Sequence, residues 1–103
     1  MSRKKIHQGE KVEVKLRPRE RELILQHTLA SPELTRPLTR SVVVKGRHHV
    51  MYTLDDLDEL LGCVAAEANH SKEKNVQKEL YELFDRLQRV MQSYDDGMWQ
   101  EAF

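Results

Sequence analysis

Residues 41–61 read SVVVKGRHHVMYTLDDLDELL, and this stretch decides the fold. β-Branched residues precede Gly46 and a second extended run follows it. This pattern is typical of a β-hairpin, because glycine accepts the left-handed backbone angles of a tight turn. We expect one strand over residues 41–44, a basic loop over residues 45–47 and a second strand over residues 48–53.

Thr53 is the next boundary along the chain, and the sequence predicts that a helix begins there. The Thr53 hydroxyl can cap free backbone amides, while Tyr52 and Leu57 can pack together across the helix start. Apolar residues then recur at helical spacing, namely Leu54, Leu57, Leu60, Leu61, Val64, Ala65 and Ala68. Gly62 costs such a helix about 1 kcal/mol relative to alanine, so we expect another helix or the sheet to pack closely against it.

A last helix is predicted from Val76 to near Gly97, with apolar residues at steps of three and four. Residues 69–72 either turn the chain or join both segments into one long helix, and Ser71 as an N-cap favours the turn. The apolar stripe is either the inner face of the core or a seam through which two copies form a homodimer. The partner interface would comprise Leu80, Leu83, Leu87, Val90, Tyr94 and Trp99.

Upstream of the hairpin, residues 12–16 alternate apolar and charged side chains, as a half-buried strand does. Pro18 can start a helix whose charged first turn, residues 19–22, faces water. Ser31 can cap a second helix, which Pro37 should stop early. The sequence therefore predicts an α+β fold, in which a three-stranded antiparallel sheet, one N-terminal strand plus the hairpin, packs against two longer C-terminal helices.

A length of 103 residues fits one domain. We expect a flexible basic tail over residues 1–11, a single α+β domain over residues 12–97 and a C-terminal tail over residues 98–103. Trp99 and Phe103 in that tail are expected to dock on their own domain or on a partner. A single cysteine, Cys63, excludes an intramolecular disulfide, and no apolar stretch has the length of a membrane span. These features predict a cytoplasmic protein with no membrane partner.

The two halves of the chain carry opposite charge. Residues 1–52 hold 12 Lys and Arg against 5 Asp and Glu, whereas residues 53–103 hold 5 against 12. Nucleic-acid binding is one interpretation, with phosphate contacts from Arg3, Lys4, Lys5, Arg17, Arg19, Arg21, Lys45 and Arg47. However, residues 31–39 are too short and too proline-rich for a recognition helix. The alternative is a solvated surface that pairs with acidic helices of the same or a neighbouring molecule.

Motifs for catalysis are missing from the sequence, which has no glycine-rich phosphate loop, nucleophile elbow or paired cysteines. Glu67 and His70 share a helical face, but a metal site would need further acidic ligands from other helices. Cys63 is expected to be a buried structural thiol. We therefore expect no enzyme, cofactor or metal site, but a small interaction or regulatory protein that dimerises through its C-terminal helices. Nucleic-acid binding is the alternative function.

Overall fold

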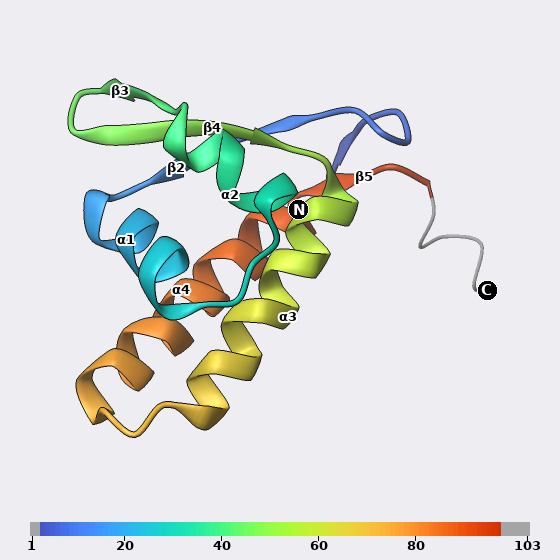
Figure 1. The fold of residues 1–103 in the computed structure, drawn as a ribbon. Coiled ribbons are helices and arrows are strands. Elements are labelled where there is room, and N and C mark those ends of the chain that lie inside the picture. The colour runs from blue at the N-terminus through green and yellow to red at the C-terminus, as the bar shows by residue number, and fades with distance from the viewer. Residues whose placement is uncertain (1–2, 98–103) are drawn as a thin grey trace.

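The computed structural model describes residues 3–97 of the chain. Its elements are β1 (Lys4–Lys5), β2 (Val12–Leu16), α1 (Pro18–His27), α2 (Pro32–Thr39), β3 (Val42–Val44), β4 (Arg47–Tyr52), α3 (Leu54–His70), α4 (Lys74–Gln92) and β5 (Tyr94–Asp95). The predicted α+β class is confirmed. An antiparallel sheet of order β2-β4-β3 lies across one end of a pair of long helices, α3 and α4, which pack together (Figure 1).

The β3–β4 hairpin forms as the sequence predicts, with a loop one residue shorter. Val44 pairs with Arg47, so only Lys45 and Gly46 make the loop. Both have left-handed backbones, with φ of 51° and 78°. Two such residues are characteristic of the type I′ turn, whose twist matches that of the strands beside it.

The start of α3 confirms the prediction at Thr53. Thr53 Oγ1 accepts a hydrogen bond from the Asp56 amide at 3.0 Å, and Asp56 Oδ2 accepts one from the Thr53 amide at 3.2 Å. Residues 71–73 separate α3 from α4, so the segment forms two helices. Ser71 ends α3, and Glu73 precedes α4, so the assignment of Ser71 as the cap of α4 is wrong.

Three predicted helix features are corrected by the structure. Pro37 does not stop α2, which continues to Thr39 because Leu34 and Leu38 anchor it in the core. Ser31 precedes α2, but its side chain makes no capping hydrogen bond. α4 ends at Gln92 instead of near Gly97, since the chain leaves the helix to form β5.

The core lies between the inner face of the sheet and the four helices, and the alternating side chains of β2 supply part of it. Glu20, expected in a water-facing turn of α1, is instead buried. Arg86 of α4 donates to both Glu20 carboxylate oxygens, at 2.7 and 2.9 Å, and to the Lys15 carbonyl at 2.6 Å. This pairing satisfies the buried carboxylate and ties α1 and the end of β2 to α4.

The start and end of the described chain meet in a parallel pair, β1 with β5. The Lys4 amide donates to the Ser93 carbonyl at 2.9 Å, and the Ile6 amide donates to the Asp95 carbonyl at 2.8 Å. The segment expected as a flexible tail over residues 1–11 therefore contains a paired strand. Residues 98–103, the expected C-terminal tail, lie outside the described part of the chain.

Candidate functional site

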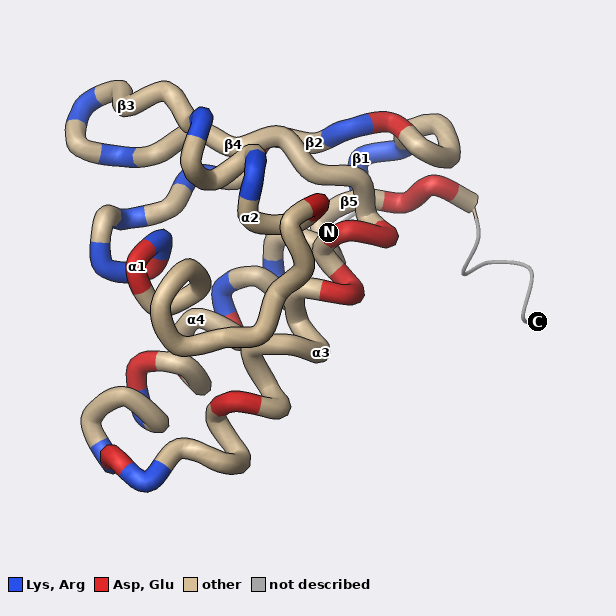
Figure 2. Tube along the Cα trace, viewed as in Figure 1, with Lys and Arg blue, Asp and Glu red and all other residues tan. Residues whose placement is uncertain are grey.

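The basic residues predicted to contact nucleic acid do not form one surface. Arg3, Lys4 and Lys5 lie in or beside β1, next to Asp95 of β5. The hairpin loop, which carries Lys45, lies at the opposite end of the sheet from β1 (Figure 2). A nucleic acid bound to one of these basic groups would have to extend along the sheet to reach the other.

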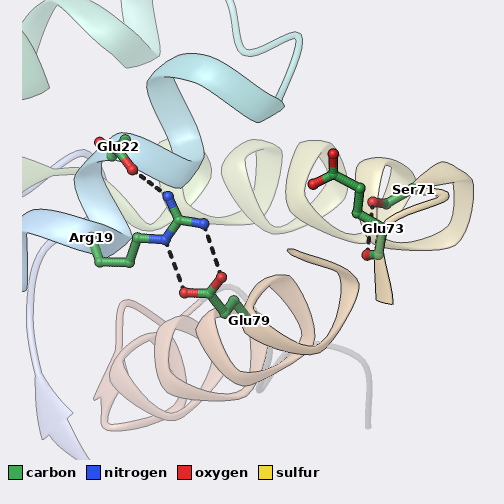
Figure 3. A network of polar contacts seen from close by, with 5 residues as sticks. All are labelled: Arg19, Glu22, Ser71, Glu73 and Glu79. Carbon is green, nitrogen blue, oxygen red and sulfur yellow. Dashed lines mark hydrogen bonds and ion pairs between the residues drawn. The ribbon is translucent and has the colours of Figure 1, made fainter. Parts of the chain in front are cut away.

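Two of the predicted phosphate ligands on α1 already have partners within the molecule. The Arg19 guanidinium donates through Nε and Nη2 to Glu79 of α4, each at 2.9 Å, and also contacts Glu22 (Figure 3). These hydrogen bonds raise the pKa of Arg19 and lower that of Glu79. Arg21 Nε donates to the Leu38 carbonyl at 2.9 Å. Of the predicted set at this end, Arg17, Arg19, Lys45 and Arg47 are exposed, and Arg21 is partly buried.

The predicted dimer seam on α4 is largely internal. Leu80, Leu83 and Leu87 are at most 1% exposed and pack in the core of their own chain. Val90 and Tyr94 are partly buried against the same core. The sixth predicted interface residue, Trp99, lies outside the described residues. The first three side chains could reach a second copy only if the core opened, so the interpretation as an inner face fits the structure.

Residues 34–53 form a region that we call the basic unit, which comprises most of α2 and the β3–β4 hairpin. It holds four cationic residues, Arg36, Arg40, Lys45 and Arg47, and no Asp or Glu. All four are exposed. The three valines of β3 are exposed as well, Val42 the most at 64%. An apolar strand flanked by cations therefore lies at the edge of the sheet (Figures 1 and 2).

The adjoining helix α3 has the opposite charge. Between Leu54 and His70 it carries five acidic residues and no Lys or Arg. Its outer face lines a groove of about 470 Å³, whose other wall is the segment from Leu29 to Leu34. The α3 residues in the groove follow one helical stripe, namely Glu59, Gly62, Cys63, Ala66, Glu67 and His70.

The groove overturns two sequence predictions. Nothing lies within 4 Å of where a Cβ on Gly62 would be, so no element packs closely there. Cys63 is partly exposed instead of fully buried. The strongest sign of this surface is Leu29, which is 96% exposed at the groove wall. Sequence reasoning passed over Leu29 because it follows α1 in an aperiodic segment, where a lone leucine has no characteristic pattern.

Residues 3–97 contain neither a candidate metal site nor a helix that could span a membrane. Within that range, no three His, Cys, Asp or Glu side chains gather where they could hold a metal ion. None of the helices there is long and apolar enough to cross a bilayer. No protein-family model matches the chain, and comparison with curated proteins and with solved structures finds no match. The candidate surfaces are therefore the groove on α3 and the basic unit.

Proposed function

We propose that this protein is a non-enzymatic, cytoplasmic interaction module whose docking surface is the groove on α3. The observation that carries the proposal is the exposed Leu29 beside exposed Gly62 and Ala66. A large apolar side chain in water beside an apolar groove is characteristic of a protein-binding surface. The single cysteine, which has no disulfide partner, fits the reducing conditions of the cytoplasm.

The occupant that fits this groove is an amphipathic helix with basic flanks. The absence of a side chain at Gly62 and the small one of Ala66 leave room for an apolar ridge of a second helix. The exposed Leu29 on the facing wall supplies further apolar contact. Glu59 and Glu67 border the groove on a helix without Lys or Arg, so cationic flanks on the partner would meet complementary charge.

This docking surface replaces the homodimer seam expected on α4, because the groove is accessible without opening the core. For the nucleic-acid alternative, fewer of the predicted basic residues are available together as phosphate ligands than the sequence suggested. Arg19 and Arg21 are engaged within the molecule, and β1 lies away from the hairpin loop. The cations left together for that alternative are Arg17 and those of the basic unit.

A designed peptide tests the proposal. The probe is a helical peptide of about 18 residues, long enough to form a helix, with leucines on one face and lysines elsewhere. We expect it to bind the full chain and to shift the amide resonances of Gly62, Cys63 and Ala66 in NMR spectra. A peptide with glutamates in place of the lysines should bind much more weakly, because it meets the acidic α3.

Gly62 provides a matched pair of variants for this titration. Gly62→Leu fills the groove and should weaken binding of the leucine–lysine peptide at least about tenfold, because the leucine blocks the partner ridge. Gly62→Ala adds one methyl group in open space and should bind nearly as well as the parent protein. Equal binding by the parent, Gly62→Ala and Gly62→Leu proteins, all folded by circular dichroism, would show that the groove is not the docking surface.

A further inference from the structure

We infer that the free edge of β3 is a second binding site, which accepts an acidic extended peptide as an added fourth strand of the sheet. This site is separate from the groove on α3 and rests on different observations. They are the hydrogen-bonding direction of the β3 backbone, the exposure of its valines, the charge around it and the conformation of Lys45. A module with both sites could hold two partners of opposite charge.

The backbone of β3 presents unused hydrogen-bonding groups at its outer side. The type I′ loop places Val44 and Arg47 in a hydrogen-bonded pair. Pairs in an antiparallel ladder alternate, so Val42 and His49 form the next hydrogen-bonded pair, while the Val43 amide and carbonyl turn away from β4. Since β4 lies between β2 and β3, no strand described in residues 3–97 covers this edge. An extended peptide can therefore bond to Val43.

The valine side chains supply apolar contact for such a strand. Val42 and Val44 lie on the outer face of the sheet with their partners His49 and Arg47, while Val43 lies on the other face. All three are exposed, by 44% to 64%. β-Branched side chains at a sheet edge favour pairing with another strand. Phosphate groups gain nothing from these valines, so the edge favours a peptide over a nucleic acid.

The surrounding charge selects an acidic occupant over a second copy of the chain. Arg40 precedes β3, and Lys45 and Arg47 follow it, with no acidic residue in residues 34–53. Two copies paired antiparallel about Val43 would bring Arg40 and Lys45 of both chains to one seam. Like charges close together across a pair of strands are destabilising. An acidic strand turns the same cations into favourable partners.

Lys45 supports a binding role because its backbone is strained. A residue with a side chain at φ 51° is disfavoured, and asparagine or glycine is preferred at this position of a type I′ turn. The loop thus keeps a cation where an uncharged residue would be more stable. Lys45→Asn should raise the midpoint of thermal unfolding and weaken the binding of an acidic peptide. The same substitution should therefore increase stability and decrease affinity.

The test uses a fluorescent peptide of alternating glutamate and valine, titrated into the full chain and followed by anisotropy and NMR. We expect saturable binding, with slowed hydrogen exchange of the Val43 amide. Val43→Pro removes that outward amide and should weaken binding about tenfold or more, whereas Val43→Thr keeps it and should bind like the parent protein. The same peptide N-methylated on alternate residues keeps its charge but should not bind.

Several outcomes would overturn this inference. Equal binding of the peptide by the Val43→Pro and Val43→Thr proteins would show that the peptide binds by charge attraction and not by strand pairing at Val43. Tighter binding of an oligonucleotide of the same charge, unaffected by Val43→Pro, would assign the basic unit to nucleic acid. Dimerisation with a protected Val43 amide in the absence of peptide would assign the edge to a second copy. None of these results bears on the groove, which is tested with the leucine–lysine peptide.

Discussion

The basic unit and α3 are neighbours in sequence and opposites in chemistry. Residues 34–53 contain four cations and no acid, while residues 54–70 contain five acids and no Lys or Arg. The backbone differs as well, because the basic unit includes the free edge of β3 with its outward Val43 amide, whereas the amides of α3 bond within the helix. The two surfaces should therefore select partners by different means, backbone pairing at β3 and side-chain packing at α3.

The largest expected effect comes from breaking the contact between α4 and α1 in the core that supports both the basic unit and α3. Arg86→Ala leaves the buried Glu20 carboxylate without its cationic partner, although the Arg17 amide still donates to it, and should lower the free energy of unfolding by about 3 kcal/mol. Urea denaturation measures this change. Arg86→Lys keeps the charge but not the two-pronged contact, so it should lose less. If both variants were as stable as the parent protein, the contact between Arg86 and Glu20 would not contribute to stability.

The next effect lies at the boundary between the two regions. Thr53→Ala removes the side-chain cap of the Asp56 amide and should lower the free energy of unfolding by about 1 kcal/mol. Thr53→Ser retains a hydroxyl cap and is the matched control. Thermal unfolding of both variants measures the difference, and a Thr53→Ala protein as stable as the Thr53→Ser protein would contradict the capping role.

Substitution of Gly62 sharpens the comparison, because it tests whether the surface of α3 at the groove is open. Gly62→Ala should raise the free energy of unfolding by up to about 1 kcal/mol, since alanine favours a helix and its methyl group meets open space. Denaturant titration of the unbound protein is the measurement. A loss of stability would mean that some part of the chain does approach Gly62.

The smallest effect concerns the ion pair of Arg19 with Glu79, which is exposed and therefore weak. Hydrogen bonding from Arg19 lowers the pKa of Glu79 below its ordinary value of 4.5. The pair thus adds stability at neutral pH and loses it as the pH falls below 4.5 through the lowered pKa. The parent should be slightly more stable than Glu79→Gln at pH 7, by less than the effect of Gly62→Ala, and this difference should shrink as the pH falls below 4.5. A difference that grew in acid would contradict this sign.

Local signals allowed much of the fold to be predicted. The hairpin follows from valines beside Gly46, and the start of α3 follows from the capping residues at Thr53. Both signals act between residues close in sequence. The α4 stripe could be assigned to a helix, but its periodicity is the same for a core face as for a dimer seam.

The features that sequence reasoning missed depend on residues far apart in the chain. Glu20 is buried because Arg86, on α4, satisfies its carboxylate. The space above Gly62 depends on the path of the segment that contains Leu29. The cations of the predicted nucleic-acid set were separated by β1 pairing with β5 and by the engagement of Arg19 with Glu79. Charge in the sequence thus indicated Lys45 and Arg47 of the basic unit, but neither Arg36 and Arg40 nor which of the predicted cations have partners within the molecule.

The pairing of β1 with β5 also bears on how the chain folds. Lys4 and Tyr94 meet across nearly the whole described sequence, so their contact closes a very large loop. The entropy cost of closing that loop falls once the intervening helices and sheet have formed. The pair spans only two residues on each side, so few backbone hydrogen bonds join its strands. The β1–β5 pair should therefore form last during folding and open first during unfolding, while the core stays intact.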